Sequence, residues 1–202
     1  MKYTMNYPSR TIMSYKERRR FLWTLFLGAL AILALTVALS ATTLSRLRFT
    51  ELAQESTAVA RLRCLSAVSR WEKEDIWTET RFEVLEAEKG LLPRLVTVRM
   101  LGGRVEHLHA RVDGVPVFRP GEEVYLFLWE TAGESYAVLG WSQGTFRIAK
   151  NPQTGVETVT QDSAAMPVFD PQTQQFRREG IRNWPVELFR ERLRGALERR
   201  RW

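Results

Sequence analysis

Two histidines stand two positions apart, His107 and His109, and the chain contains no others. In a β-strand alternate residues share a face, so both imidazoles would point the same way and can hold a metal ion between them. A metal site needs a third ligand, and Glu106 would point to the opposite face. The alternative is a solvated strand face, and we expect neither a bound metal nor a cofactor.

The single cysteine, Cys64, lies in a segment whose apolar residues alternate with Arg61 and Arg63. We expect the inward-facing set of this strand to contain Ala60, Leu62, Cys64, Ser66 and Val68. One thiol makes no intrachain disulfide, and one cysteine with two histidines cannot complete a structural zinc site. The position favours a core cysteine over a reactive thiol.

Other catalytic signatures are missing from the sequence. Gly102-Gly103 lacks the lysine and the helix of a phosphate-binding loop, and no nucleophile elbow of the G-x-S-x-G type occurs. The neighbouring carboxylates Glu122 and Glu123 would point to opposite faces of a strand, which is a poor arrangement for paired acid–base chemistry. We therefore predict that the protein is not an enzyme.

Tryptophan is frequent in the carboxy-terminal part of the chain. Trp77 and Trp129 lie out of phase with the apolar positions or at a strand end, and Trp141 follows a glycine. Exposed aromatic side chains on a β-surface can form a binding platform, so we take these three residues, with Arg190 and Arg194, as a candidate partner surface. The alternative is that the last helix or a linker covers them.

The net charge of +7 is unevenly distributed. Residues 1–20 hold six basic residues and one acidic residue, and residues 177–202 hold nine arginines and four glutamates, so each segment carries +5. The stretch between them carries −3. A nucleic-acid-binding protein would place the positive charge on its folded surface, so we expect no nucleic-acid partner.

Residues 21–44 contain no charged side chain, and as a helix they would extend about 36 Å, enough to cross a bilayer. The preceding basic segment, 1–20, predicts an amino terminus in the cytoplasm. We therefore expect a single-pass anchor in the cell membrane, with the remaining domain periplasmic or extracellular. The alternatives are a signal peptide cleaved after Ala38-Leu39-Ser40, or a buried helix of a soluble protein.

The remaining sequence predicts a mainly β domain. We expect a short helical connector at 45–58, a small antiparallel barrel at 59–160, a linker at 161–182 and a basic amphipathic helix at 183–202. The expected strands are Val59–Val68, Ile76–Leu85, Leu95–Leu101, Val105–Val112, Val115–Phe118, Glu123–Trp129, Ser135–Trp141, Thr145–Lys150 and Val156–Thr160. Asp113-Gly114 is expected to form the hairpin turn between two of them.

The final helix would begin at Asn183-Trp184-Pro185, with proline in its first turn. One of its faces is apolar, with Val186, Phe189, Leu193, Ala196 and Leu197, and arginines surround that face. This pattern fits a helix that docks on the barrel, lies on an anionic membrane surface or binds a partner.

The order of short motifs resembles the netrin-module family, whose members include the tissue inhibitors of metalloproteinases. The motifs are Trp77-Thr78, Phe82-Glu83-Val84, Glu88-Lys89-Gly90, Gly102-Gly103, the run from Pro120 to Leu128, and Gly140 with Gln143-Gly144. The resemblance covers about residues 50–150, is to the shorter bacterial versions and implies an OB-like barrel. Inhibitors of that family act through an amino-terminal cysteine and disulfides, whereas this chain has only Cys64 in mid-strand, so their mechanism cannot be carried over.

The sequence thus leads to a membrane-anchored, exported, non-catalytic interaction module that binds a protein partner or an envelope assembly. The alternative is a regulator or inhibitor of an exported peptidase, which rests on the netrin resemblance. An enzyme with an unrecognised site is third. The sequence names no small-molecule ligand.

Overall fold

The structure is a computed structural model that describes residues 45–131, 133 and 135–198, together with Lys16, Arg19 and Trp23. The chain divides into two compact units, Met1–Thr42 and Thr43–Trp202. Of the predicted membrane anchor at 21–44 and the basic segment before it, all but those three residues lie outside the described part. Within the described residues, no helix is both long enough and apolar enough to cross a bilayer.

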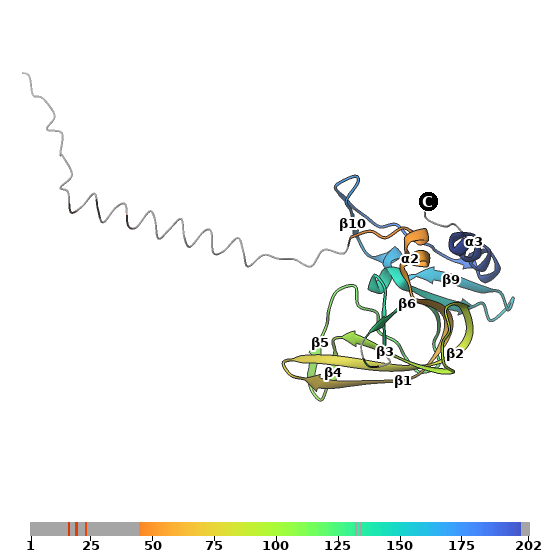
Figure 1. The fold of residues 1–202 in the computed structure, drawn as a ribbon, viewed down its shortest axis with the longest axis horizontal. Helices are drawn as coiled ribbons and strands as arrows, with labels where there is room; N and C mark the ends of the chain where they lie inside the picture. Colours follow the sequence, from red (N-terminus) through yellow and green to blue (C-terminus); the bar gives the residue numbers. More distant parts are fainter. Residues whose placement is uncertain are drawn as a thin grey trace, which may run out of the picture. The chain divides into compact units, whose positions relative to one another are not determined.

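The second unit is mainly β, as the sequence predicts (Figure 1). Its largest sheet contains β1 (Ala58–Glu72), β2 (Asp75–Lys89), β3 (Leu95–Leu101), β6 (Glu123–Thr131), β7 (Ser135–Val138), β8 (Thr145–Lys150), β9 (Glu157–Gln161) and β12 (Trp184–Pro185). Smaller pairs are β4 (Gly103–Val105) with β5 (Leu108–Ala110), and β10 (Val168–Asp170) with β11 (Gln175–Arg177). The helices are α2 (Phe49–Glu55) and α3 (Val186–Glu198), and the 3₁₀ turns are η1 (Trp141–Gly144) and η2 (Asp162–Ala165).

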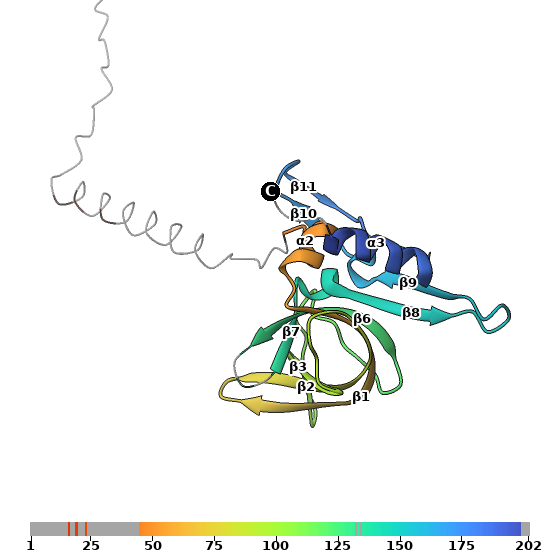
Figure 2. The same cartoon turned by 45° about the vertical axis from the view of Figure 1, so that its right-hand side comes forward.

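Five strands of the large sheet close into a ring. The order is β1-β2-β3-β7-β6, and β6 pairs back onto β1 through Ala58–Arg63. Four of these pairings are antiparallel, whereas β3 and β7 run parallel. Figure 2 shows the ring with β8, β9 and both helices on one side of it. Closure leaves these strands without a free edge over the paired stretch.

A β-bulge in β1 changes which side chains face the inside of this ring. Cys64 lies opposite Phe82, but Ser66 lies opposite Arg81, so Leu65 is an extra residue. Beyond it Ala67 and Ser69 point inward and Val68 is 53% exposed. The expectation that Ser66 and Val68 face inward was therefore wrong, because one extra residue exchanges the two faces of a strand.

Strand β6 separates two hydrophobic cores. Its Val124, Leu126 and Leu128 lie inside the ring, while Tyr125 and Phe127 belong to an outer core beneath the helices. All five side chains are fully buried. A strand covered on both faces needs apolar residues at every position, which explains the uninterrupted run in its sequence.

The outer core is built from aromatic rings. Phe49 of α2 makes edge-on contacts with Phe127, Phe146 and Phe189, at centroid distances of 5.8, 5.9 and 5.6 Å. The apolar face of α3 is buried in this core through Val186, Phe189, Leu193 and Ala196. Of the three interpretations of the last helix, docking on the β-domain therefore accounts for its apolar stripe.

Lys89, at the end of β2, holds the carboxyl end of α2. Its Nζ donates hydrogen bonds to the carbonyl oxygens of Ala53 and Gln54, both at 2.9 Å, and to that of Ser56. The last carbonyls of a helix have no partner within the helix and carry partial negative charge. The ammonium group satisfies three of them at once.

Three predicted segments differ from the structure. The last helix, expected to begin at Asn183-Trp184-Pro185, begins at Val186, because Trp184 and Pro185 form β12 and pair with β9. The expected strands Val105–Val112 and Val115–Phe118 are replaced by the β4–β5 hairpin, which turns at Glu106-His107 rather than at Asp113-Gly114. Glu106 adopts the left-handed conformation (φ 53°) that this two-residue turn requires. The expected linker at 161–182 contains η2 and the β10–β11 hairpin, and Ile181 reaches the outer core.

Candidate functional site

The structure brings three of the predicted residues, Trp77, Trp129 and Trp141, to one groove on the outside of the ring. The groove has a volume of about 470 Å³. We call it the tryptophan groove, and its other lining residues are Arg99, Met100, Leu101, Thr131, Ala137, Val138, Leu139 and Gly140. Trp129 is half exposed, so a partner can reach it.

Strand pairing brings the groove residues together. Trp77 faces outward on β2 opposite Leu101 of β3, and Trp129 lies opposite Ala137 of β7. Gly140 and Trp141 both have positive φ, 63° and 53°, so the chain turns sharply as it leaves β7. This turn directs Trp141 against the ring core, where it fixes one wall of the groove.

Arg99 is the one charged side chain among the described residues that line the groove. Neighbouring carboxylates compensate its charge. Its guanidinium lies over the Trp77 ring, 5.2 Å from the centroid, and contacts the carboxylates of Glu72 and Glu79. The stacking fixes the indole, and the charges of the two glutamates are balanced by Arg99 and by Arg70, which contacts Glu79. The groove therefore offers rigid aromatic surface with little net charge.

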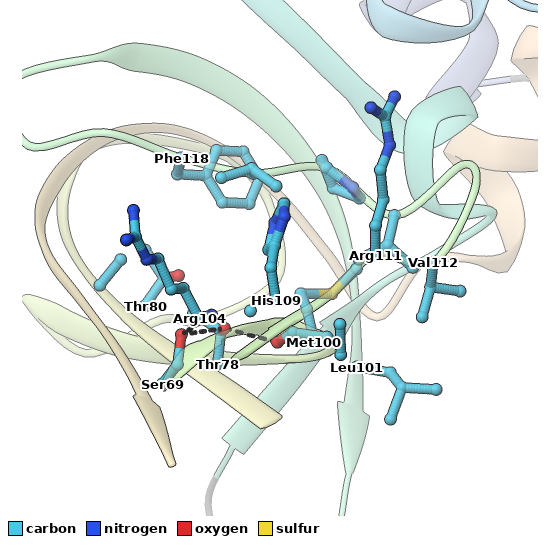
Figure 3. A pocket seen from close by; sticks show the side chains of 17 residues that line it. Ser69, Thr78, Thr80, Met100, Leu101, Arg104, His109, Arg111, Val112 and Phe118 are labelled. Atoms are coloured by element: carbon cyan, nitrogen blue, oxygen red, sulfur yellow. Dashed lines mark hydrogen bonds between the residues drawn. The ribbon is translucent and has the colours of Figure 1, made fainter. Parts of the chain in front are cut away.

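A second hollow opens at one end of the ring interior (Figure 3). This ring pocket has a volume of about 410 Å³. It is lined by three hydroxyl residues, by apolar side chains and by three basic residues: Ser69, Thr78, Thr80; Met100, Val112, Phe118; Arg104, His109, Arg111.

Two of the hydroxyl groups form a directed hydrogen-bond chain. Thr78 Oγ1 donates to the carbonyl oxygen of Gly102 at 2.6 Å, so Ser69 Oγ is the donor in the 2.8 Å bond to Thr78. Ser69 in turn accepts from the amide of Arg104. A Cβ on Gly103 would lie 2.2 Å from Thr78 Oγ1, so this close approach requires glycine.

The predicted histidine pair does not share a strand face. His107 lies in the β4–β5 turn, where its side chain is exposed, and His109 lies in β5 at the ring pocket. The strand interpretation was wrong because the hairpin turns at Glu106-His107. Among the described residues, no group of three or more histidine, cysteine, aspartate or glutamate side chains is placed to hold a metal ion.

The predicted arginines of α3 do not line the tryptophan groove. Arg190 is half-buried and forms ion pairs with Glu86 and Glu88 of β2, so it anchors the helix. Arg194 is exposed. The structure therefore separates the arginine half of the predicted partner surface from the tryptophan half.

Cys64 lies inside the ring and is 1% exposed. Burial, together with the nearby Glu122 carboxylate, raises the pKa of its thiol. Both effects disfavour the nucleophilic thiolate. The position matches the expected core cysteine.

Comparison of the chain with family models, with curated proteins and with solved structures found no significant match. The functional interpretation therefore depends on the geometry of the described residues and on the sequence patterns. Sequence reasoning missed Arg99 and the ring-pocket residues Arg104 and Arg111. A usable signal was present, because Thr78 and Thr80 place small hydroxyl groups at consecutive inward positions of β2, where a filled core would have large apolar residues.

Proposed function

We propose that the protein is a membrane-anchored, exported, non-catalytic interaction module that binds a protein partner through the tryptophan groove. The supporting observation is that Trp77, Trp129 and Trp141, from three separate elements, line one groove. Tryptophan is enriched among the residues that dominate binding energy at protein interfaces, and Trp129 is the exposed member of this set. The export and anchoring in the cell membrane rest on the apolar segment 21–44 and the basic residues before it.

We also propose that the ring is an OB-like barrel of the netrin type. Its order β1-β2-β3-β7-β6, with β3 and β7 parallel, supports this assignment. OB-folds bind ligands on the face formed by their second and third strands and the adjoining loops. The tryptophan groove includes part of the corresponding β2–β3 face, through Trp77, Arg99 and Leu101, and extends onto β6 and β7. This argument is an analogy at the level of fold.

The balanced charge of the groove restricts the partner. Because Glu72 and Glu79 balance the charges of Arg99 and Arg70, the groove offers no net charge to attract an acidic segment. Aromatic grooves of this kind accept proline-rich or aliphatic segments, which lose little conformational entropy on binding. We therefore propose an uncharged, extended segment of the partner as the bound element.

The test is co-purification of the full-length chain from its native membranes. We expect a partner protein to be recovered with the unaltered chain and at least about tenfold less of it with Trp129→Ala, as for a central interface tryptophan. Trp71→Ala is the matched control, since Trp71 is equally exposed but lies outside the groove. Equal recovery with both variants, or no partner at all, contradicts the proposal.

Inhibition of an exported peptidase is the alternative, and an enzyme with an unrecognised site is third. The netrin-type mechanism needs an accessible amino-terminal cysteine, whereas Cys64 is enclosed in the ring. A panel of exported peptidases assayed with micromolar full-length chain distinguishes the two main proposals. Inhibition that survives Trp129→Ala would favour the peptidase regulator.

A further inference from the structure

We propose that the ring pocket is a second binding site, specific for a small amphiphilic organic anion: an apolar body carrying a carboxylate or a phosphate group. The apolar body occupies the hollow, and the anionic group lies between Arg104 and Arg111 at its rim. Met100 and Leu101 line both this pocket and the tryptophan groove, but Arg104 and Arg111 do not line the groove, and the site does not depend on the proposed protein partner.

The hollow results from the size of the inward-facing side chains. Towards one end of the ring, Leu62 and Phe82 fill the interior and are fully buried. Towards the other end the residues of β1 and β2 that line the interior are small, Ala67, Ser69, Thr78 and Thr80, and a space of about 410 Å³ remains. Ligand sites in proteins usually measure about 300–1,000 Å³, so the space is large enough for a small organic molecule.

The chemistry of the walls decides how such a ligand is oriented. Met100, Val112 and Phe118 supply apolar surface. The hydroxyl hydrogens of Ser69 and Thr78 are already donated, to Thr78 and to the carbonyl of Gly102. These two residues therefore offer no donor to an anion, and burying an anion against them would leave its charge uncompensated. The anionic group is favoured at the rim, where the basic side chains that line the pocket lie.

The rim carries basic side chains that lack strong internal partners. Arg104 Nε donates to the backbone oxygen of Glu106, and no carboxylate contact of Arg104 occurs among the described residues. Arg111 lies 3.9 Å from Asp113, and both side chains are more than 80% exposed, so solvent weakens this pair. His109 extends in the same direction as these arginines (Figure 3).

Other arginines around the ring differ clearly from this pair. Arg61 contacts Glu123 and Glu157, and Arg147 contacts Glu122 and Asp162. Those arginines are neutralised by the fold itself. Positive charge is left uncompensated at the rim of a cavity, within a stretch of chain whose net charge is −3. An anion with two charge-assisted hydrogen bonds complements that arrangement.

The experiment is calorimetric titration of the full-length chain in zwitterionic lipid nanodiscs, with empty nanodiscs as the blank. The probes are hexanoate, hexyl phosphate and neutral hexan-1-ol. We expect at least one anion to bind at one site per chain, and at least about tenfold more tightly than hexanol. The better of the two anions identifies the head group. No binding of either anion, or equal binding of hexanol, overturns the proposal.

Variants test the location. Arg104→Gln combined with Arg111→Gln should weaken anion binding at least about tenfold, while Arg81→Gln, which removes an exposed charge from the outer face of β2, should not. Thr80→Leu, which fills the hollow, should abolish binding of the apolar body. Trp129→Ala should leave anion binding unchanged, which keeps this proposal distinguishable from the one for the groove. Unchanged binding in the double arginine variant overturns it.

Discussion

The two faces of β6 show how one strand serves two different cores. On its inner face Val124, Leu126 and Leu128 belong to an aliphatic core that is filled towards one end of the ring and hollow towards the other. On its outer face Tyr125 and Phe127 belong to an aromatic core closed by α2 and α3. Both faces are equally apolar in sequence, but the hollow inside the ring measures about 410 Å³, whereas the hollow beside the outer core, at Phe49 and Ile181, measures about 190 Å³.

The difference follows from what surrounds each face. Hydrogen bonds between five strands fix the circumference of the ring, so it cannot contract around small side chains such as Ala67 and Ser69. The helices over the outer face are held by side-chain packing and can approach until the space is filled. We therefore expect the outer core to carry more of the stability and the ring to carry the binding sites.

Removing an aromatic ring from the outer core should have the largest effect. Phe189 contacts Phe49, Tyr125 and Phe146, and it is fully buried. Phe189→Ala is expected to lower the free energy of unfolding by about 3–5 kcal/mol, measured by urea denaturation. Phe176→Ala, at an exposed phenylalanine in β11, should change it by less than about 0.5 kcal/mol. A loss below about 1 kcal/mol for Phe189→Ala would contradict the importance given to this core.

The contact between the ring and α2 should come next. Lys89→Met leaves three carbonyl oxygens of the α2 carboxyl end without their donor. We expect a loss of about 2 kcal/mol, because partly buried carbonyls are costly to leave unpaired. Lys150→Met, at an exposed lysine at the end of β8, is the control. Equal stability of the two variants in thermal melts would show that Lys89 does not hold the helix.

Enlarging a side chain should distinguish the filled core from the hollow one. Ala196→Leu forces a larger group into the outer core and is expected to cost about 1–2 kcal/mol. Thr80→Ile adds volume inside the ring pocket and should change stability by less than about 1 kcal/mol in either direction. Equal costs measured by urea denaturation would mean that the pocket closes in solution.

The smallest effect concerns a hydroxyl group in the outer core. Tyr125 Oη is buried and has no hydrogen-bond partner among the residues that the structure describes, so Tyr125→Phe should stabilise the chain by about 1 kcal/mol at pH 7. Burial also raises the pKa of Tyr125 to about 12, whereas the unfolded residue ionises near 10. Between these values the unfolded state binds fewer protons, so the stability of the unaltered chain falls as the pH rises.

The difference in free energy of unfolding between Tyr125→Phe and the unaltered chain should therefore widen above pH 10. Every other titrating group is common to both chains and cancels in this difference. Urea denaturation at pH 7, 9, 10 and 11 measures it. A constant difference across this range would contradict the raised pKa.

Local patterns predicted much of the fold. The third strand, Leu95–Leu101, has the predicted bounds, and the apolar run of β6 indicated a strand covered on both sides. Features that depend on ring closure were not predictable. The bulge at Leu65 provides curvature that no local pattern records, and the meeting of Trp77 with Trp129 and Trp141 depends on which strands become neighbours.

The candidate sites, like the fold, could be predicted only in part. Their residue types were visible in the sequence, because tryptophans out of phase with the core stand out. Whether a given charge is free or compensated was not visible, because the partners of Arg99 lie 20 and 27 positions away along the chain. The position of His107 in a turn depended on a single residue, Glu106, with a left-handed backbone.

The extra residue in β1 affects the register of the β1–β2 hairpin. The two-residue turn at Lys73-Glu74 sets the alignment from one end of the β1–β2 hairpin, and Cys64 opposite Phe82 sets it from the other. The alignment set by the turn and the alignment set by Cys64 and Phe82 differ by one residue, and that unpaired residue is Leu65. Deleting Leu65 should straighten the strand yet keep Ala67 and Ser69 inside. Inserting one residue between Ser66 and Ala67 should reverse the alternation there, and the ring would have to accommodate the insertion in addition to the three register shifts that the β1–β2 pair already has.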